Sequence, residues 1–62
     1  MIDITHQNGF RGILEKDGEF TVYKDGELVM QTYRARLTTE EDVRRELAEM
    51  PRFIEMVRVI HD

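Results

Sequence analysis

The sequence predicts an α+β fold: an antiparallel β-meander of three to four strands, one helix packed on one face, and a closing C-terminal strand. Three observations predict it. The segment Lys-Asp-Gly-Glu occurs at residues 16–19 and again at 24–27, and apolar runs flank both copies, which is a strong signal for β-hairpins. Apolar residues then recur at helical spacing after residue 42, and β-branched residues cluster near the C-terminus.

The 62 residues are expected to form one small domain, residues 1–62. A chain of this length buries only about 60% of its unfolded surface and is marginally stable unless it is stapled or oligomeric. No cysteine is present, so no disulfide framework is expected, and we expect an intracellular, cytoplasmic protein. No run is apolar enough to span a membrane, and the start of the chain does not resemble a signal peptide.

A short N-terminal strand is predicted because Ile2-Asp3-Ile4-Thr5 alternates apolar and polar residues and is followed by Asn8-Gly9, another hairpin signal. A three-residue loop at this turn would place Ile2 and Ile4 on the same face as Leu14. This strand would be the extra, fourth strand, at an edge of the sheet.

The three central strands are predicted at residues 10–16, 19–24 and 28–33. Three-residue loops at both Asp-Gly turns set Leu14 opposite Phe20 and Val22 opposite Leu28, which separates apolar from polar side chains; a one-residue slip would mix them. One face then carries Phe10, Gly12, Leu14, Phe20, Val22, Leu28 and Met30. Gly12 inside a strand indicates a bulge or the close approach of the covering helix.

The opposite face is polar near the turns but has an apolar centre, predicted to consist of Ile13, Tyr23, Val29 and Tyr33. A face exposed to water usually alternates more cleanly. We therefore expect a partner chain, the N-terminal segment or a ligand to cover it.

A helix is predicted from about residue 39. Thr38 with Glu41 three residues later is typical of a capping box. Val43, Leu47 and Met50 form one apolar stripe that would pack on the sheet. Pro51 is expected to end the helix near Met50, because proline disfavours helical geometry in the preceding residue.

Residues 52–61 fit two structures. As a helix, Phe53, Val57 and Ile60 would share one face. As a strand, Val57 and Val59 would share a face, and the β-branched residues in close succession favour this interpretation. We therefore predict a closing strand that is buried on both faces or inserted between other strands.

The layout resembles the YegP-like β3-α-β family, through Gly18-Glu19-Phe20-Thr21-Val22, Asp25-Gly26-Glu27, Tyr33 and the helix opening near Thr39. Units of that family pair as tandem repeats or as dimers, sharing one sheet and exchanging the last strand. The resemblance therefore implies a homodimer and carries over no catalytic residue. The helix sequence Val43-Arg-Arg-Glu-Leu47 departs from the pattern of that family.

A second resemblance is to three-stranded DNA-binding domains of the integrase-arm and AP2 type, through Phe10-Arg11-Gly12 and the hairpins that follow. Arg11, Arg34 and Arg36 are the candidate contacts for an anion or a nucleic acid. However, acidic residues in both turns would repel phosphates, and the net charge of −4 argues against a nucleic-acid partner.

No enzymatic function is predicted, because the sequence lacks a nucleophile–base pair, a metal-binding cluster and a phosphate-binding glycine loop. No cofactor is expected. We predict a homodimeric structural or protein-interaction module that associates through the sheet face or the C-terminal strand. A nucleic-acid-binding or regulatory domain that uses the exposed sheet face is the alternative. The predicted interface residues are Ile13, Tyr23, Val29, Tyr33, Phe53, Val57 and Val59.

Overall fold

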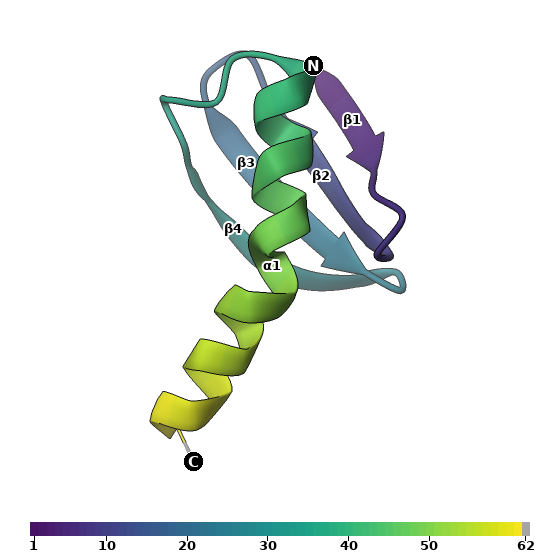
Figure 1. The fold of residues 1–62 in the computed structure, drawn as a ribbon. Coiled ribbons are helices and arrows are strands. Elements are labelled where there is room, and N and C mark those ends of the chain that lie inside the picture. Colours follow the sequence, from purple (N-terminus) through teal and green to yellow (C-terminus); the bar gives the residue numbers. More distant parts are fainter. Residues whose placement is uncertain (62) are drawn as a thin grey trace.

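The computed structural model describes the backbone of residues 1–61 and the side chains of residues 1–55. Four strands form one antiparallel sheet in the order β1-β2-β3-β4, and one helix packs on it (Figure 1). The elements are β1 (Ile2–Thr5), β2 (Phe10–Leu14), β3 (Glu19–Lys24), β4 (Glu27–Tyr33) and α1 (Glu40–His61). The predicted α+β meander is confirmed, including the N-terminal strand.

The first two turns have the predicted length. At the β2–β3 turn, the Glu15 amide donates to the Glu19 carbonyl at 2.8 Å, and Gly18 takes a positive φ of 96°. This closes a three-residue loop and sets Leu14 opposite Phe20. The β1–β2 turn closes in the same way, so that Ile2 lies opposite Leu14, as predicted.

The β3–β4 turn differs from the prediction. Lys24 pairs with Glu27, so the loop has only two residues, and both have positive φ, 52° for Asp25 and 81° for Gly26. These are the signs of a type I′ turn, whose twist matches that of paired strands. A bulge opposite Val22 and Tyr23 then shifts the register.

The two-residue turn sets the register of Leu28, and the bulge sets that of Met30 and the residues after it. Val22 pairs with Met30 and not, as predicted, with Leu28, which instead lies opposite Tyr23. Leu28 is consequently 59% exposed on the face that the helix does not cover. The prediction was wrong here because it treated the two Asp-Gly turns as equivalent.

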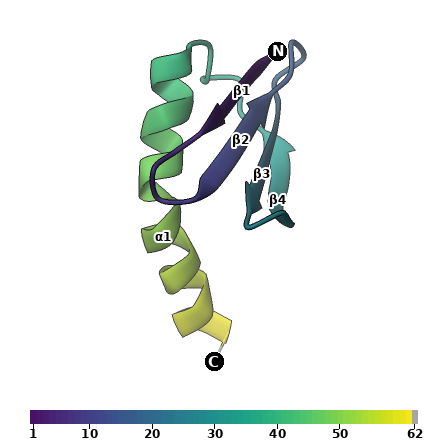
Figure 2. The ribbon, with the colours of Figure 1, turned by 90° about the vertical axis from the view of Figure 1, so that its right-hand side faces the viewer.

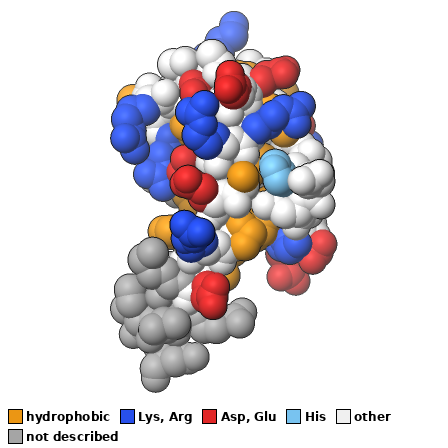
Figure 3. Space-filling model, viewed as in Figure 1, with side chains coloured by type: hydrophobic (Ala, Val, Ile, Leu, Met, Phe, Trp, Pro, Cys, Tyr) orange, Lys and Arg blue, Asp and Glu red, His pale blue; other side chains and the backbone are white. Residues whose placement is uncertain are grey.

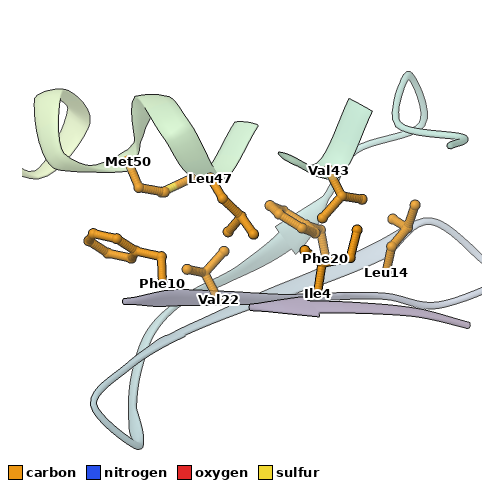
Figure 4. Close-up of a cluster of buried hydrophobic side chains, with 8 residues drawn as sticks. All are labelled: Ile4, Phe10, Leu14, Phe20, Val22, Val43, Leu47 and Met50. Atoms are coloured by element: carbon orange, nitrogen blue, oxygen red, sulfur yellow. The ribbon is translucent and has the colours of Figure 1, made fainter. Parts of the chain in front are cut away.

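The hydrophobic core lies between the sheet and the first half of α1 (Figures 2 and 4). Gly12 allows the close contact, since a Cβ atom there would lie 3.0 Å from the Phe20 ring and 3.1 Å from Leu47. The buried hydrophobic side chains are Ile4, Phe10, Leu14, Phe20, Val22, Val43, Leu47 and Met50. The predicted helix stripe and the close approach at Gly12 are both confirmed.

The capping box of α1 lies one residue later than predicted. The Asp42 amide donates to the Thr39 hydroxyl at 3.2 Å, and the Thr39 amide donates to Asp42 Oδ2 at 3.1 Å. Thr39 is therefore the N-cap, and Asp42 takes the position that the sequence pattern assigned to Glu41.

The helix continues through Pro51 to His61, so the predictions of a helix end at Met50 and of a C-terminal strand were both wrong. Proline removes the N–H that would bond to the carbonyl four residues earlier, here that of Leu47. That carbonyl instead accepts a hydrogen bond of 2.9 Å from the Asn8 side-chain amide. The second half of α1 extends beyond the end of the sheet (Figure 1).

Candidate interaction surfaces

The face of the sheet opposite α1 is the first candidate surface, and no other described element covers it (Figure 2). We call it the open face. Its apolar side chains are Ile13, Tyr23, Leu28 and Tyr33. Leu28 is 59% exposed and Tyr33 is 67% exposed, while Ile13 and Tyr23 are half-buried. Large apolar side chains at this exposure are typical of a contact region.

Polar side chains on the open face are mostly paired with one another. Arg11 binds Asp3 with two hydrogen bonds of 2.9 and 2.6 Å. This contact lowers the pKa of Asp3 and raises that of Arg11, chiefly through the hydrogen bonds between the two side chains. Gln31 donates to Glu19 at 2.6 Å.

The predicted interface residues do not all come together. Ile13, Tyr23 and Tyr33 share the open face, but Val29 lies at the bulge and packs against the core. Leu28 takes the place of Val29 on the open face. The sequence signal for this exchange is Asp25-Gly26, which is typical of a two-residue turn.

Phe53, also predicted for the interface, lies on α1 just beyond Pro51 and is 43% exposed. It lines a pocket on the helix side of the sheet with Arg34 and Met50. Val57 and Val59 fall in the last part of α1, and their side chains lie outside the described residues.

A second candidate surface is a groove beside α1, which we call the arginine groove. The helix lies over β1 and β2, away from β4, and two adjoining pockets of about 240 and 220 Å³ run along its other side. Arg34 and Glu46 line both pockets. The second pocket also has Arg36, Leu37, Asp42 and Arg45 in its wall.

The three predicted anion contacts are therefore divided between the two surfaces. Arg34 and Arg36 line the arginine groove together with Arg45, which was not among the predicted contacts. Arg11 lies on the open face and is bound to Asp3. Arg45 could not be found from sequence spacing, because its place beside Arg34 depends on how α1 crosses the sheet.

Metal-binding geometry does not emerge within the described residues. His6 accepts a hydrogen bond of 3.1 Å from the Asn8 amide through Nδ1 and so supports the first turn. No group of three or more His, Asp or Glu side chains in this part of the chain is arranged to hold a metal ion. The described helical residues include no stretch with the length and hydropathy needed to cross a membrane.

Comparison of the chain with protein-family models, with curated proteins and with solved structures finds no match.

Proposed function

We propose that this protein is a homodimeric interaction module whose two copies meet through their open faces. The observation that carries the proposal is the exposure of Leu28 (59%) and Tyr33 (67%) beside Ile13 and Tyr23. A small domain that leaves large apolar side chains on an uncovered sheet face gains stability by burying them against a partner. The lack of cysteine is consistent with a cytoplasmic setting for such a dimer.

The layout of the open face supports a symmetric contact. Its apolar residues lie on the three strands β2, β3 and β4, and the Arg11–Asp3 pair lies toward the β1 edge. Gln31, which is bound to Glu19, lies between Leu28 and Tyr33, so the face combines apolar contact area with paired polar groups, as interfaces usually do. A typical interface takes about 800 Å² from each partner, which is about one sixth of the 4713 Å² surface of this chain.

The nucleic-acid alternative receives less support from the same face. Arg11 is the predicted nucleic-acid contact on the open face, and the Asp3 carboxylate already neutralises its charge at 2.6 Å. Glu19 also lies there and would repel a phosphate backbone.

The experiment is a measurement of molar mass by size exclusion with light scattering over a wide range of protein concentration. We expect a dimer for the natural sequence and a monomer for Leu28→Glu, since a charge in a desolvated interface costs several kcal/mol. Ala48→Glu is the matched control, because Ala48 is exposed on α1 and not on the open face. It should leave the dimer intact.

Two results would contradict the proposal. A natural protein that stays monomeric at every concentration would rule out the dimer. A folded Leu28→Glu variant that remains dimeric would show that the contact lies elsewhere on the molecule.

A further inference from the structure

We propose that the arginine groove binds an oxyanion, a phosphate or carboxylate group, through the guanidinium groups of Arg34, Arg36 and Arg45. This site lies on the helix side of the sheet, and it does not depend on the proposed dimer. Basic side chains gather over the connection between β4 and α1 at the left of Figure 3, with acidic side chains beside them.

Arg34 is held in place by its backbone. Its amide donates to the Gly18 carbonyl at 2.9 Å, and its own carbonyl accepts from the Leu37 amide at 3.1 Å. The side chain is 34% exposed, yet its Nε atom is buried and has no hydrogen-bond partner among the described residues. Buried polar atoms are normally satisfied, so this unsatisfied donor marks a guanidinium group that the fold itself leaves underpaired.

The acidic neighbours do not supply that acceptor. Glu46 Oε1 lies 3.7 Å from Arg34 Nε, beyond hydrogen-bond distance. Arg45 donates only a long hydrogen bond of 3.5 Å to Glu41, on the exposed surface, and its second terminal nitrogen lies 3.8 Å from Asp42. By contrast, the Arg11–Asp3 pair on the open face closes to 2.6 Å.

The Asp42 carboxylate already accepts hydrogen bonds at the start of the helix. Its Oδ2 atom accepts from the Thr38 amide at 3.0 Å and from the Thr39 amide at 3.1 Å. Because this carboxylate is held by the capping box, it cannot turn fully toward Arg45. The arginines of the groove therefore retain N–H groups that a bound anion could use.

The chemistry of the ligand follows from these donors. A guanidinium group presents a planar fork of N–H donors that matches the oxygens of phosphate or carboxylate. Three arginines and two acids line the pocket of about 220 Å³, so one small anion fits the local balance of charge. A long polyanion does not, because the chain as a whole carries a net charge of −4.

The test is an NMR titration of the ¹⁵N-labelled protein with inorganic phosphate and, separately, with acetate, at constant ionic strength. We expect the Nε–H signal of Arg34 and the backbone amides of Arg36 and Leu37 to shift and to saturate. Loss of one charge-assisted contact should weaken binding about tenfold, so Arg36→Gln and Arg45→Gln should each raise the Kd by about that factor.

Arg44→Gln is the matched control, since it removes the same charge from an exposed position next to Arg45 that does not line the groove. It should change the Kd by less than about twofold. Each variant is first compared with the natural protein by its thermal midpoint, so that a loss of binding is not confused with a loss of fold.

Every outcome of the titration decides the proposal. Saturable binding of phosphate, of acetate or of both upholds an oxyanion site, and the tighter ligand identifies the chemical group. Shifts that grow linearly without saturation would overturn it, as would equal weakening by Arg44→Gln, since both indicate general charge screening.

Discussion

At the scale of single residues, Gly12 determines how closely α1 approaches the sheet. The site where its Cβ would stand lies 3.0 Å from the Phe20 ring and 3.1 Å from Leu47 Cδ2. Both neighbours are fully buried, so neither can move aside without disturbing the packing around it.

We therefore expect Gly12→Ala to lower the free energy of unfolding by about 1–3 kcal/mol, the usual cost of overpacking a core. Chemical denaturation would measure it. The combination with Leu47→Ala provides the control, because it removes one of the two side chains that the new methyl group meets. The double variant should lose less stability than the two single changes added together; strict additivity would show that the contact with Leu47 is not the cause.

Asp42 is a second residue with a testable role, this time through pH. Hydrogen bonds from the Thr38 and Thr39 amides hold its pKa below the ordinary value of 3.8. A carboxylate with a lowered folded-state pKa stabilises the fold fully above its unfolded-state pKa, and that stabilisation is lost as the pH falls through the folded-state value.

The thermal midpoint should therefore decrease as the pH is lowered from the ordinary aspartate value toward the lowered one, and Asp42→Asn should decrease less over the same range. Thermal unfolding of both proteins across this window measures the difference. Asp17→Asn serves as the comparison, since the Asp17 carboxylate accepts from the Glu19 amide within the β2–β3 turn and not from the start of α1. An equally steep decrease in natural protein and Asp42→Asn would exclude Asp42 as the source.

At the scale of elements, α1 contains a proline that its sequence pattern assigns to a helix end. The helix continues because the Asn8 side chain supplies the hydrogen bond that Pro51 cannot. Asn8 also accepts from the Phe10 amide through Oδ1 and from Lys24 through its carbonyl oxygen. One residue of the first turn thus joins two hairpins and the helix.

A double-mutant cycle tests this compensation. Asn8→Ala should cost about 1–3 kcal/mol in the natural sequence, because the Leu47 carbonyl is left unsatisfied. In a Pro51→Ala background the cost should be smaller by about 1 kcal/mol, since residue 51 then offers its own N–H. Gln7→Ala, a neighbouring exposed change, should show no such coupling. Equal costs of Asn8→Ala in both backgrounds would contradict the assigned role.

These elements also show which features of the fold can be predicted from local sequence patterns and which cannot. The strands, two of the three turns and the stripe of Val43, Leu47 and Met50 follow from local patterns, because alternation and helical spacing reflect which face is buried. The continuation of α1 does not follow from a local pattern. Its hydrogen bond comes from residue 8, and no window around Pro51 contains that information.

The candidate surfaces show the same limit. Ile13, Tyr23 and Tyr33 could be placed on one face by alternation alone. Leu28 took the place of Val29 on the open face because a two-residue turn sets the register of Leu28 and a bulge follows at Val29. Arg45 came beside Arg34 only through the crossing of α1 over the sheet, which depends on packing as a whole.

At the scale of the whole molecule, the two proposed surfaces lie on opposite sides of the sheet. The open face carries Leu28 and Tyr33, whereas the arginine groove lies beside α1. Two ligands are coupled only if the binding of one changes the affinity of the protein for the other. A rigid sheet between two separate sites gives neither ligand a contact that depends on whether the other site is occupied.

We therefore expect saturating phosphate to leave the dimer dissociation constant unchanged within about twofold. Analytical ultracentrifugation with and without phosphate would measure it. In the same way, Leu28→Glu should keep the phosphate affinity of the natural protein while it abolishes the dimer. A strong dependence of dimerisation on phosphate would instead place the anion at the contact between copies.

The hydrogen bond from Asn8 to Leu47 also bears on how the chain folds. It joins residues that are 39 positions apart, so its closure is a non-local event of the kind that slows folding. A peptide containing only residues 38–61 would leave the Leu47 carbonyl to water at the very point where proline weakens the helix. We expect such a peptide to be mostly unstructured on its own, and the long helix to form together with the first hairpin in one cooperative step.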